Sequence, residues 1–241
     1  MTTRFHIGAK DLQGSVAAYA KRFGLLEVRA DARAPTPAAL RKWRKAVPPN
    51  FEFAVIAGPK LAQLKASPAL EEELVLAKQM IDILQARFFL LQTPADVTPG
   101  AVWRDRMGQL LERLPRDVTQ IGWEPRGVWE TDDAAVAAKK WGIVLVVDAA
   151  REPVPAGPVA YVRLRAMGET RSFGESALAR VVENIGSRRD AYVVLETSSA
   201  LAECKQLRRL AQHPPSRFEG GMGRVVRPRG LTVKVRDDEQ E

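Results

Sequence analysis

Residues 51–93, FEFAVIAGPKLAQLKASPALEEELVLAKQMIDILQARFFLLQT, decide the fold. Two short apolar runs, Phe51–Ala57 and Phe88–Thr93, are rich in β-branched and aromatic residues and have the length of strands. Between them Ser67–Leu84 is typical of a helix, with glutamates 71–73 in its early turns, where the helix dipole favours negative charge. This order predicts two parallel strands joined by a right-handed helical crossover.

The same unit recurs along the chain. Further strands are expected at Phe5–Ala9, Leu25–Ala30, Thr119–Glu124, Ile143–Asp148, Val159–Arg165 and Tyr192–Thr197. Further helices are expected at Gly14–Phe23, Pro37–Ala46, Val102–Leu114, Asp132–Trp141, Gly174–Ile185 and Ser198–Ala211. In the sixth unit, Ala149–Pro158 carries three prolines and a glycine, which predicts a loop in place of a helix.

Eight such units predict an α/β fold, a TIM-like (β/α)8 barrel that forms a single domain over residues 1–213. An open, doubly wound sheet is the competing architecture. Eight units favour closure, and no Gly-x-Gly-x-x-Gly motif follows a strand. Residues 214–241 are basic and rich in proline and glycine, and we expect them to form a short C-terminal tail.

Charge and cysteine content narrow the classes of partner. The 241 residues carry a net charge of +8, which is compatible with an anionic ligand or with nucleic acid. Nucleic acid would be bound through the tail, the alternative being a tail that is only solvated. The single cysteine, Cys204, cannot form an internal disulfide, and it is expected to be buried in a helix. With no signal-like segment and no apolar run of about 18 residues, the chain is expected to be cytoplasmic, without a membrane partner.

Polar residues stand at the ends of the predicted strands, where TIM barrels carry their functional sites. Side chains two positions apart in a strand share a face, so Glu27 lies with Arg29, and Arg163 with Arg165. One mouth of the barrel would therefore gather many acids and arginines. The candidate catalytic residues are Glu124, Glu27 and Asp148; the candidate binding residues are Arg126, Arg163, Gln92, Arg165, Arg29, Trp129 and Glu196.

These residue types fit a small anionic or sugar-like molecule. The planar fork of arginine binds carboxylate or phosphate at two points, and carboxylates serve as general acids and bases. Trp129, in the loop after the fifth strand, could wall such a pocket or simply anchor the loop. The competing interpretation of the whole set is solvated residues and ion pairs that hold the barrel shut.

The sequence gives less support to metal sites, cofactors or a catalytic triad. His6 and His213 lie far apart in the pattern, so a histidine-rich zinc or iron site is not expected, and neither is a cofactor. A Mg²⁺ site made by the carboxylates of Glu27, Glu124 and Asp148 stays open as an alternative. No Ser-His-Asp arrangement is found.

A series of motifs resembles a known family. They are Lys42-Trp43-Arg44, Pro49-Asn50-Phe51-Glu52-Phe53-Ala54-Val55, Leu91-Gln92-Thr93-Pro94, Trp123-Glu124-Pro125-Arg126-Gly127, Val147-Asp148 and Tyr161-Val162-Arg163-Leu164. In this order they resemble the YecE-like family, a domain of unknown function described as related to sugar isomerases, over about residues 5–211. The resemblance implies a TIM-like barrel. It also implies that Glu27, Gln92, Glu124, Arg126, Asp148 and Arg163 occupy the family's recurring polar positions.

Three positions depart from the family pattern. Ile56 stands where the family has a lysine, Arg165-Ala166 where it has His-Gly, and Glu196-Thr197 where it has Asn-Asn. The sequence is therefore compatible with two functions. One is an enzyme that uses carboxylate acid/base chemistry on a small anionic or sugar-like substrate, and the other is a non-catalytic barrel that binds a ligand or partner. Neither the substrate nor the oligomeric state follows from the residues.

Overall fold

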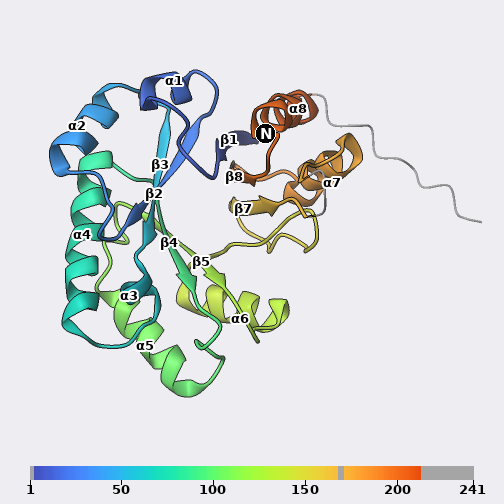
Figure 1. Ribbon diagram of the computed structural model, residues 1–241. Coiled ribbons are helices and arrows are strands. Elements are labelled where there is room, and N and C mark those ends of the chain that lie inside the picture. The colour runs from blue at the N-terminus through green and yellow to red at the C-terminus, as the bar shows by residue number, and fades with distance from the viewer. Residues whose placement is uncertain (1–2, 168–170, 213–241) are drawn as a thin grey trace, which may run out of the picture.

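A computed structural model describes residues 3–167 and 171–212, and strands and helices alternate along them (Figure 1). The strands are β1 Arg4–Ala9, β2 Leu25–Ala30, β3 Glu52–Ala57, β4 Phe88–Thr93, β5 Gln120–Pro125, β6 Val144–Leu145, β7 Val159–Arg165 and β8 Asp190–Glu196. The helices are α1 Val16–Ala20, α2 Pro37–Lys45, α3 Pro59–Ala62, α4 Pro68–Leu84, α5 Ala101–Glu112, α6 Thr131–Trp141, α7 Glu175–Ile185 and α8 Ala200–Gln212.

The strands are parallel and surround a common centre (Figure 1). Five of them pair in the order β2-β3-β4-β5-β6, and three pair in the order β7-β8-β1. Two seams join these groups. At one, the Gly24 amide donates to the Ile7 carbonyl at 2.8 Å. At the other, Val147 bridges Val162. The predicted TIM-like barrel in a single domain is confirmed, and the proposed tail lies outside the described residues.

Side-chain parity divides the core into two layers. Residues such as Leu25, Phe88, Tyr161 and Tyr192 point inward and fill the barrel. The alternate residues of the same strands point outward and pack under the helices. Because both faces of each parallel strand are buried in these two layers, each strand is a continuous apolar run in the sequence. The same alternation determines whether the polar side chain at the end of each strand points into the barrel or outward.

The element bounds differ from the sequence prediction mainly in the sixth unit. We expected a strand over Ile143–Asp148, but β6 covers only Val144–Leu145. Beyond β6, the Val146 amide still donates to the Trp123 carbonyl of β5 at 2.8 Å, and the pairing with β7 is reduced to one bridge between Val147 and Val162. The loop expected over Ala149–Pro158 is confirmed, and in Figure 1 the chain between α6 and β7 contains no further helix. The short helix α3 was not predicted.

Capping residues mark where the helices begin and end. Ser67 caps α4 by accepting a hydrogen bond from the Leu70 amide at 3.1 Å, with Pro68 in the first turn. Gly142 ends α6 in the left-handed conformation, with φ of 65°.

Among the described helices, none combines the length and the hydropathy that a membrane crossing requires.

Candidate functional site

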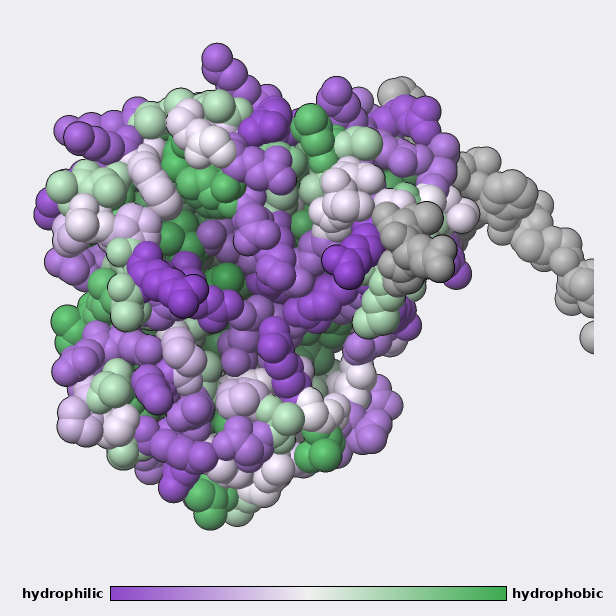
Figure 2. Space-filling view, in the orientation of Figure 1, coloured by the Kyte–Doolittle hydropathy of each residue, from purple (hydrophilic) through white to green (hydrophobic). Residues whose placement is uncertain are grey.

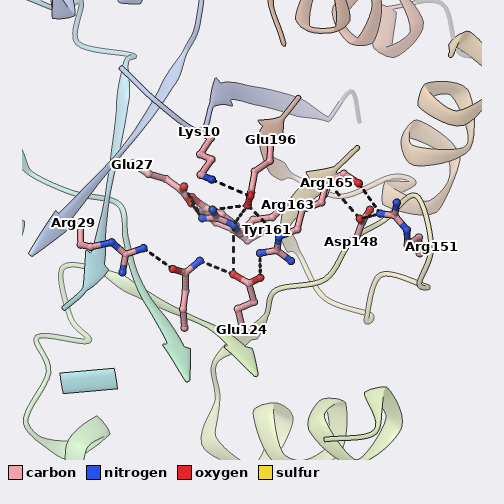
Figure 3. A network of polar contacts seen from close by, with 11 residues as sticks. Lys10, Glu27, Arg29, Glu124, Asp148, Arg151, Tyr161, Arg163, Arg165 and Glu196 are labelled. Carbon is pink, nitrogen blue, oxygen red and sulfur yellow. Dashed lines mark hydrogen bonds and ion pairs between the residues drawn. The ribbon is translucent and has the colours of Figure 1, made fainter. Parts of the chain in front are cut away.

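The inward-facing polar residues at the carboxyl ends of the strands meet at the mouth of the barrel (Figure 3). On several strands a polar residue follows an inward-facing core residue by two positions, as Glu27 follows Leu25 on β2 and Arg163 follows Tyr161 on β7. The side-chain parity used in the sequence prediction therefore holds. The strand residues brought together in this way are Glu27, Arg29, Gln92, Glu124, Arg163, Arg165 and Glu196.

Arg163 is the centre of the network. Its Nη1 lies 2.5 Å from Glu27 Oε1 and 2.6 Å from Glu27 Oε2. Its Nη2 lies 2.6 Å from Glu196 Oε1, and its Nε lies 3.4 Å from Glu124 Oε2. Burial opposes the charged form of Arg163, but the three carboxylates outweigh burial and raise its pKa. One buried guanidinium thus holds carboxylates from three different strands.

Glu27 is fully occupied by its neighbours. Besides the contacts with Arg163, its Oε1 accepts a hydrogen bond from the Tyr161 hydroxyl at 2.9 Å. Burial raises the pKa of Glu27, against the opposing effect of Arg163 and Tyr161. Burial and the nearby Glu27 raise the pKa of Tyr161 well above its ordinary value, so its hydroxyl stays a donor. The sequence reasoning missed Tyr161, although it lies two positions before Arg163 on the same face.

Glu124 connects the buried network to the surface. Its Oε2 accepts a hydrogen bond from Gln92 Nε2 at 2.7 Å, and the Gln92 Oε1 accepts one from Arg29 Nη2 at 2.9 Å. Its Oε1 forms an ion pair with Arg165 Nη2. Arg165 keeps 34% of its side chain exposed, whereas that of Glu124 is 8% exposed. Arg165 therefore covers the Glu124 carboxylate on the solvent side.

The positions that depart from the family pattern lie at this mouth. The Arg165 Nε lies 3.3 Å from Glu196 Oε1, so these two residues form an ion pair with each other. Lys10 Nζ lies 3.9 Å from Glu196 Oε2. Burial favours a higher pKa for Glu196, but the charges of Arg163, Arg165 and Lys10 outweigh it and lower the pKa. Ile56 is buried in the barrel, beside Arg29 in the strand register.

A hollow of about 720 Å³ opens beside the network, over the ends of β1, β7 and β8. Arg165 and Glu196 form part of its floor, and Lys10, Asp11 and Arg171 also line it. Figure 2 shows hydrophilic side chains gathered across the middle of this face of the molecule. Pockets that bind small molecules have volumes of about 300–1,000 Å³, so this hollow is large enough for a small polar molecule.

Three predicted site residues lie away from the centre of the network: Asp148 at its edge, and Arg126 and Trp129 outside it. Asp148 forms an ion pair with Arg151 and accepts a hydrogen bond from the Arg165 amide at 3.3 Å, so it braces the adjacent loops (Figure 3). Arg126 is exposed, and its side chain makes no hydrogen bond or ion pair within residues 3–167 and 171–212. Trp129 donates to the Val97 carbonyl at 2.7 Å and packs edge-on against Trp123, which is the arrangement of a loop anchor.

The carboxylates do not form a metal cluster. In the described part of the chain, no three residues among His, Cys, Asp and Glu are placed to hold one ion. The positive charge of Arg163 lies against both Glu27 and Glu124, and Asp148 is directed to Arg151. His6 lies at the other end of the barrel, 3.6 Å from Asp190, and His213 lies outside the described residues. Cys204 is buried, as expected.

Comparison with known proteins identifies the family. Residues 5–223 match the family described as "Protein of unknown function DUF72". The chain belongs to the DUF72 family. This is the YecE-like family that the motifs indicated, so the resemblance seen in the sequence is confirmed. No curated protein sequence matches the chain.

Solved structures agree with this assignment. A DUF72 family protein from Enterococcus faecalis superposes with a TM-score of 0.70 at 17% identity, covering 87% of this chain and 98% of the other. A DUF72 family protein from Thermotoga maritima gives 0.66 at 16% identity, with 87% and 99% covered. A xylose isomerase domain containing protein from Salmonella typhimurium gives 0.58 at 18% identity, with 86% and 95% covered. At these identities the likeness shows the fold.

Proposed function

We propose that the barrel mouth of this DUF72 protein binds a small anionic or sugar-like molecule and transfers a proton on it, with Glu124 as the general acid/base. The observation that carries the proposal is the pairing of Glu124 with Arg165. Arg163 lies buried beneath the carboxylates, but Arg165 is partly exposed and borders the hollow. It can therefore exchange its protein partner for a ligand.

The contacts divide the roles of the two buried carboxylates. Both oxygens of Glu27 are held by Arg163, and one of them also accepts from Tyr161, so Glu27 acts as a fixed counter-ion. Glu124 has one oxygen held by Gln92 and the other by the exposed Arg165. Glu124 does not itself line the hollow, but its outer partner Arg165 does, so displacement of Arg165 by a ligand would open the way to Glu124.

Ligand binding would expose the reactive group. A carboxylate or phosphate on the ligand accepts the guanidinium fork of Arg165, because such paired, charge-assisted hydrogen bonds are strong and directional. Glu124 Oε1 then faces the ligand without its partner. It takes a proton from the hydroxyl-bearing carbon next to the carbonyl group of the ligand, which gives an enediolate, and it returns that proton to the former carbonyl carbon. The hydroxyl proton passes from the oxygen that becomes the new carbonyl to the oxygen of the old one, which completes the isomerisation.

The energetic cost of the network supports a functional role. Desolvating ions costs several kcal/mol each, and buried ion pairs are often no more stable than apolar residues of the same volume. Here three carboxylates and two arginines lie in the top layer of a barrel that apolar side chains could fill. The fold of the Salmonella xylose isomerase domain containing protein agrees with a sugar-like ligand.

Isotope exchange tests the proton transfer without knowledge of the product. The protein is incubated in D2O with a panel of sugar phosphates and sugar acids, and loss of carbon-bound protons is followed by NMR. Exchange should fall by about 100-fold or more in Glu124→Gln, since general acid–base groups contribute on that order. Glu72→Gln, an exposed glutamate on α4, should exchange at the parent rate. Parent-like exchange in Glu124→Gln would contradict the assignment.

A non-catalytic binding function is the second candidate. The observation in its favour is that every carboxylate of the network already has a cationic partner, and that two of the three family departures, Arg165 and Glu196, pair with each other. Saturation-transfer NMR on the same panel separates the two functions. Binding that weakens in Arg165→Gln, without isotope exchange in the parent protein, favours the binding function.

Nucleic-acid association through residues 214–241 remains a separate proposal. Between Pro214 and Arg236 the sequence has six basic residues and one acidic residue. Contacts with phosphates release counter-ions and give a steep salt dependence. A titration of the full chain and of a chain ending at residue 213, each at two salt concentrations, should show a salt slope only for the full chain. Equal slopes would reject the tail as the binding element.

A further inference from the structure

A second hollow, also of about 720 Å³, lies at the opposite end of the strands from the mouth. It is a groove between the first residues of β5 and β7, strand β6, helix α6 and the loop over residues 154–158. The sixth unit has no helix, and the groove lies beside the strand that lacks one. Its apolar lining includes Val136, Ile143, Val144, Val154, Pro155 and Val159.

The open seam between β6 and β7 gives the groove its depth. Val144 and Val159 belong to the packing inside the barrel, whereas Leu145 and Ala160 point to the outer layer, and all four line the groove. The groove therefore reaches both layers of the core through the seam. Its volume and mostly apolar lining are those of small-molecule sites in proteins.

One polar atom in the groove lacks a partner. Thr119 is 3% exposed and lines the groove, yet its Oγ1 has no hydrogen-bond partner in the described structure. Buried hydroxyl groups are nearly always hydrogen-bonded in folded proteins, so an unpaired one calls for an explanation. The atom is fully buried beside the groove, so a ligand would accept its hydrogen bond after the Thr119 side chain turns its hydroxyl toward the groove.

The charged residues of the groove are all positive. Arg116, Lys139 and Arg189 line it, and no acidic side chain does. Arg116 donates to the Trp141 and Gly142 carbonyls, and Arg189 pairs with Asp190. Lys139 is exposed and forms no hydrogen bond or ion pair with any described side chain. The groove thus combines an apolar lining with positive charges at its edge, which suits a ligand that has an apolar chain and an anionic group.

We propose that the groove binds an anionic amphiphile, an aliphatic carboxylate of medium chain length. The chain lies among the valines and prolines, and the carboxylate accepts a hydrogen bond from Thr119 and faces Lys139. This site is separate from the barrel mouth, so it does not depend on the function proposed there.

Calorimetric titration of the full chain with octanoate and decanoate, below their micelle concentrations, tests the proposal. One molecule should bind per chain. Decanoate should bind about tenfold more tightly than octanoate, because two more methylene groups are buried. Burial of the chain should also give a negative heat-capacity change. Decanol, which lacks the charge, should bind more weakly than decanoate.

Two variants locate the site. Thr119→Val keeps the shape and removes the hydroxyl, and it should weaken decanoate binding about tenfold, as expected for a hydrogen bond to a charged group. Lys139→Gln should weaken it about two- to fivefold, the usual range for an exposed ion pair. Lys140→Gln, the neighbouring exposed lysine outside the groove, should bind as the parent does. Thermal unfolding of each variant checks that the fold is intact.

Two outcomes would overturn the proposal. One is decanoate binding that is unchanged in both Thr119→Val and Lys139→Gln. The other is an absence of decanoate binding to the parent chain.

Discussion

At the scale of single residues, Arg163 determines how this barrel mouth is organised. A guanidinium offers five donors in a rigid plane, so one side chain can reach several carboxylates at once. Arg163 uses them on Glu27 and Glu196 and lies close to Glu124. A lysine at the same position would be a single point charge and could not hold three strands in this way.

Removal of Arg163 should destabilise the fold strongly. Arg163→Met leaves Glu27 buried without its cationic partner, which costs about 3–5 kcal/mol in comparable buried pairs. Urea unfolding measures the loss. The double variant Arg163→Met/Glu27→Gln should recover part of it, because the uncompensated charge is then gone. Arg41→Met, an exposed arginine on α2, serves as the control. An equal loss in Arg163→Met and Arg41→Met would contradict the role given to the network.

The lowered pKa of Glu196 predicts that the folded protein loses stability at acid pH. Between its ordinary value of about 4.3 and its lower native pKa, the unfolded chain binds more protons than the native one at this residue. The free energy of unfolding should therefore fall as the pH drops below about 4.3. In Glu196→Gln this part of the pH dependence should be missing, which urea unfolding at several pH values between about 6 and 2.5 would show. Parallel curves for the two proteins would contradict it.

At the scale of elements, close strand packing depends on small residues. A Cβ added at Gly8 of β1 would lie 2.3 Å from the Leu25 carbonyl oxygen of β2. A Cβ at Gly122 of β5 would lie 2.4 Å from a methyl carbon of Leu90. Contacts this short do not occur in folded proteins. Glycine at position 8 therefore lets β1 and β2 approach and the barrel close at the seam between them, and glycine at position 122 leaves room for the Leu90 side chain inside the barrel.

The Gly8→Ala variant should test this close approach. Its methyl group meets backbone, which cannot rotate away, and overpacking of this kind costs about 1–3 kcal/mol. Gly108→Ala on α5 is the matched control, because nothing lies within 4 Å of its added Cβ. Alanine in a helix is favoured over glycine by about 1 kcal/mol, so that control should gain stability. A stable Gly8→Ala protein would show that the seam can widen.

At the scale of the whole molecule, the barrel is closed unevenly. Long ladders hold β2 to β3 and β4 to β5, while the wall between β6 and β7 depends on one bridge and on the loop that replaces a helix. The mouth network and the apolar groove lie at opposite ends of this barrel. Weak closure at one wall leaves room for the groove without disturbing the strands that hold Glu27 and Glu124.

Native-state hydrogen exchange should detect the weak wall. Amide protons of Val144–Val146 should exchange by local opening, with a free energy well below that of global unfolding. Those of β4, which pairs on both sides, should exchange only on global unfolding. The measurement is the exchange free energy of each amide at increasing denaturant concentrations. Equal values for the two strands would show that the barrel opens as one unit.

Much of the fold could be predicted from the sequence because each local signal agrees with the others. Apolar runs of strand length, capped helices and a proline-rich sixth connection gave the barrel, and parity placed Glu27, Glu124 and Arg163 at one mouth. The shortness of β6 could not be predicted, because Ile143–Asp148 has strand composition, and only the tertiary structure decides that its pairing with β7 consists of one bridge. The cytoplasmic setting stays a prediction.

The sequence by itself determined the βα rhythm, the family and the end of the barrel at which the polar residues gather, because these depend on periodicity and on alternation along single strands. Only the tertiary structure decided which of these residues contact one another. Tyr161, Arg163 and Arg165 of β7 form a network with Glu27 of β2 and Glu196 of β8, and Arg126 and Trp129 stay outside it. Such contacts depend on the closure of the barrel, which sets distances that no spacing along the chain contains.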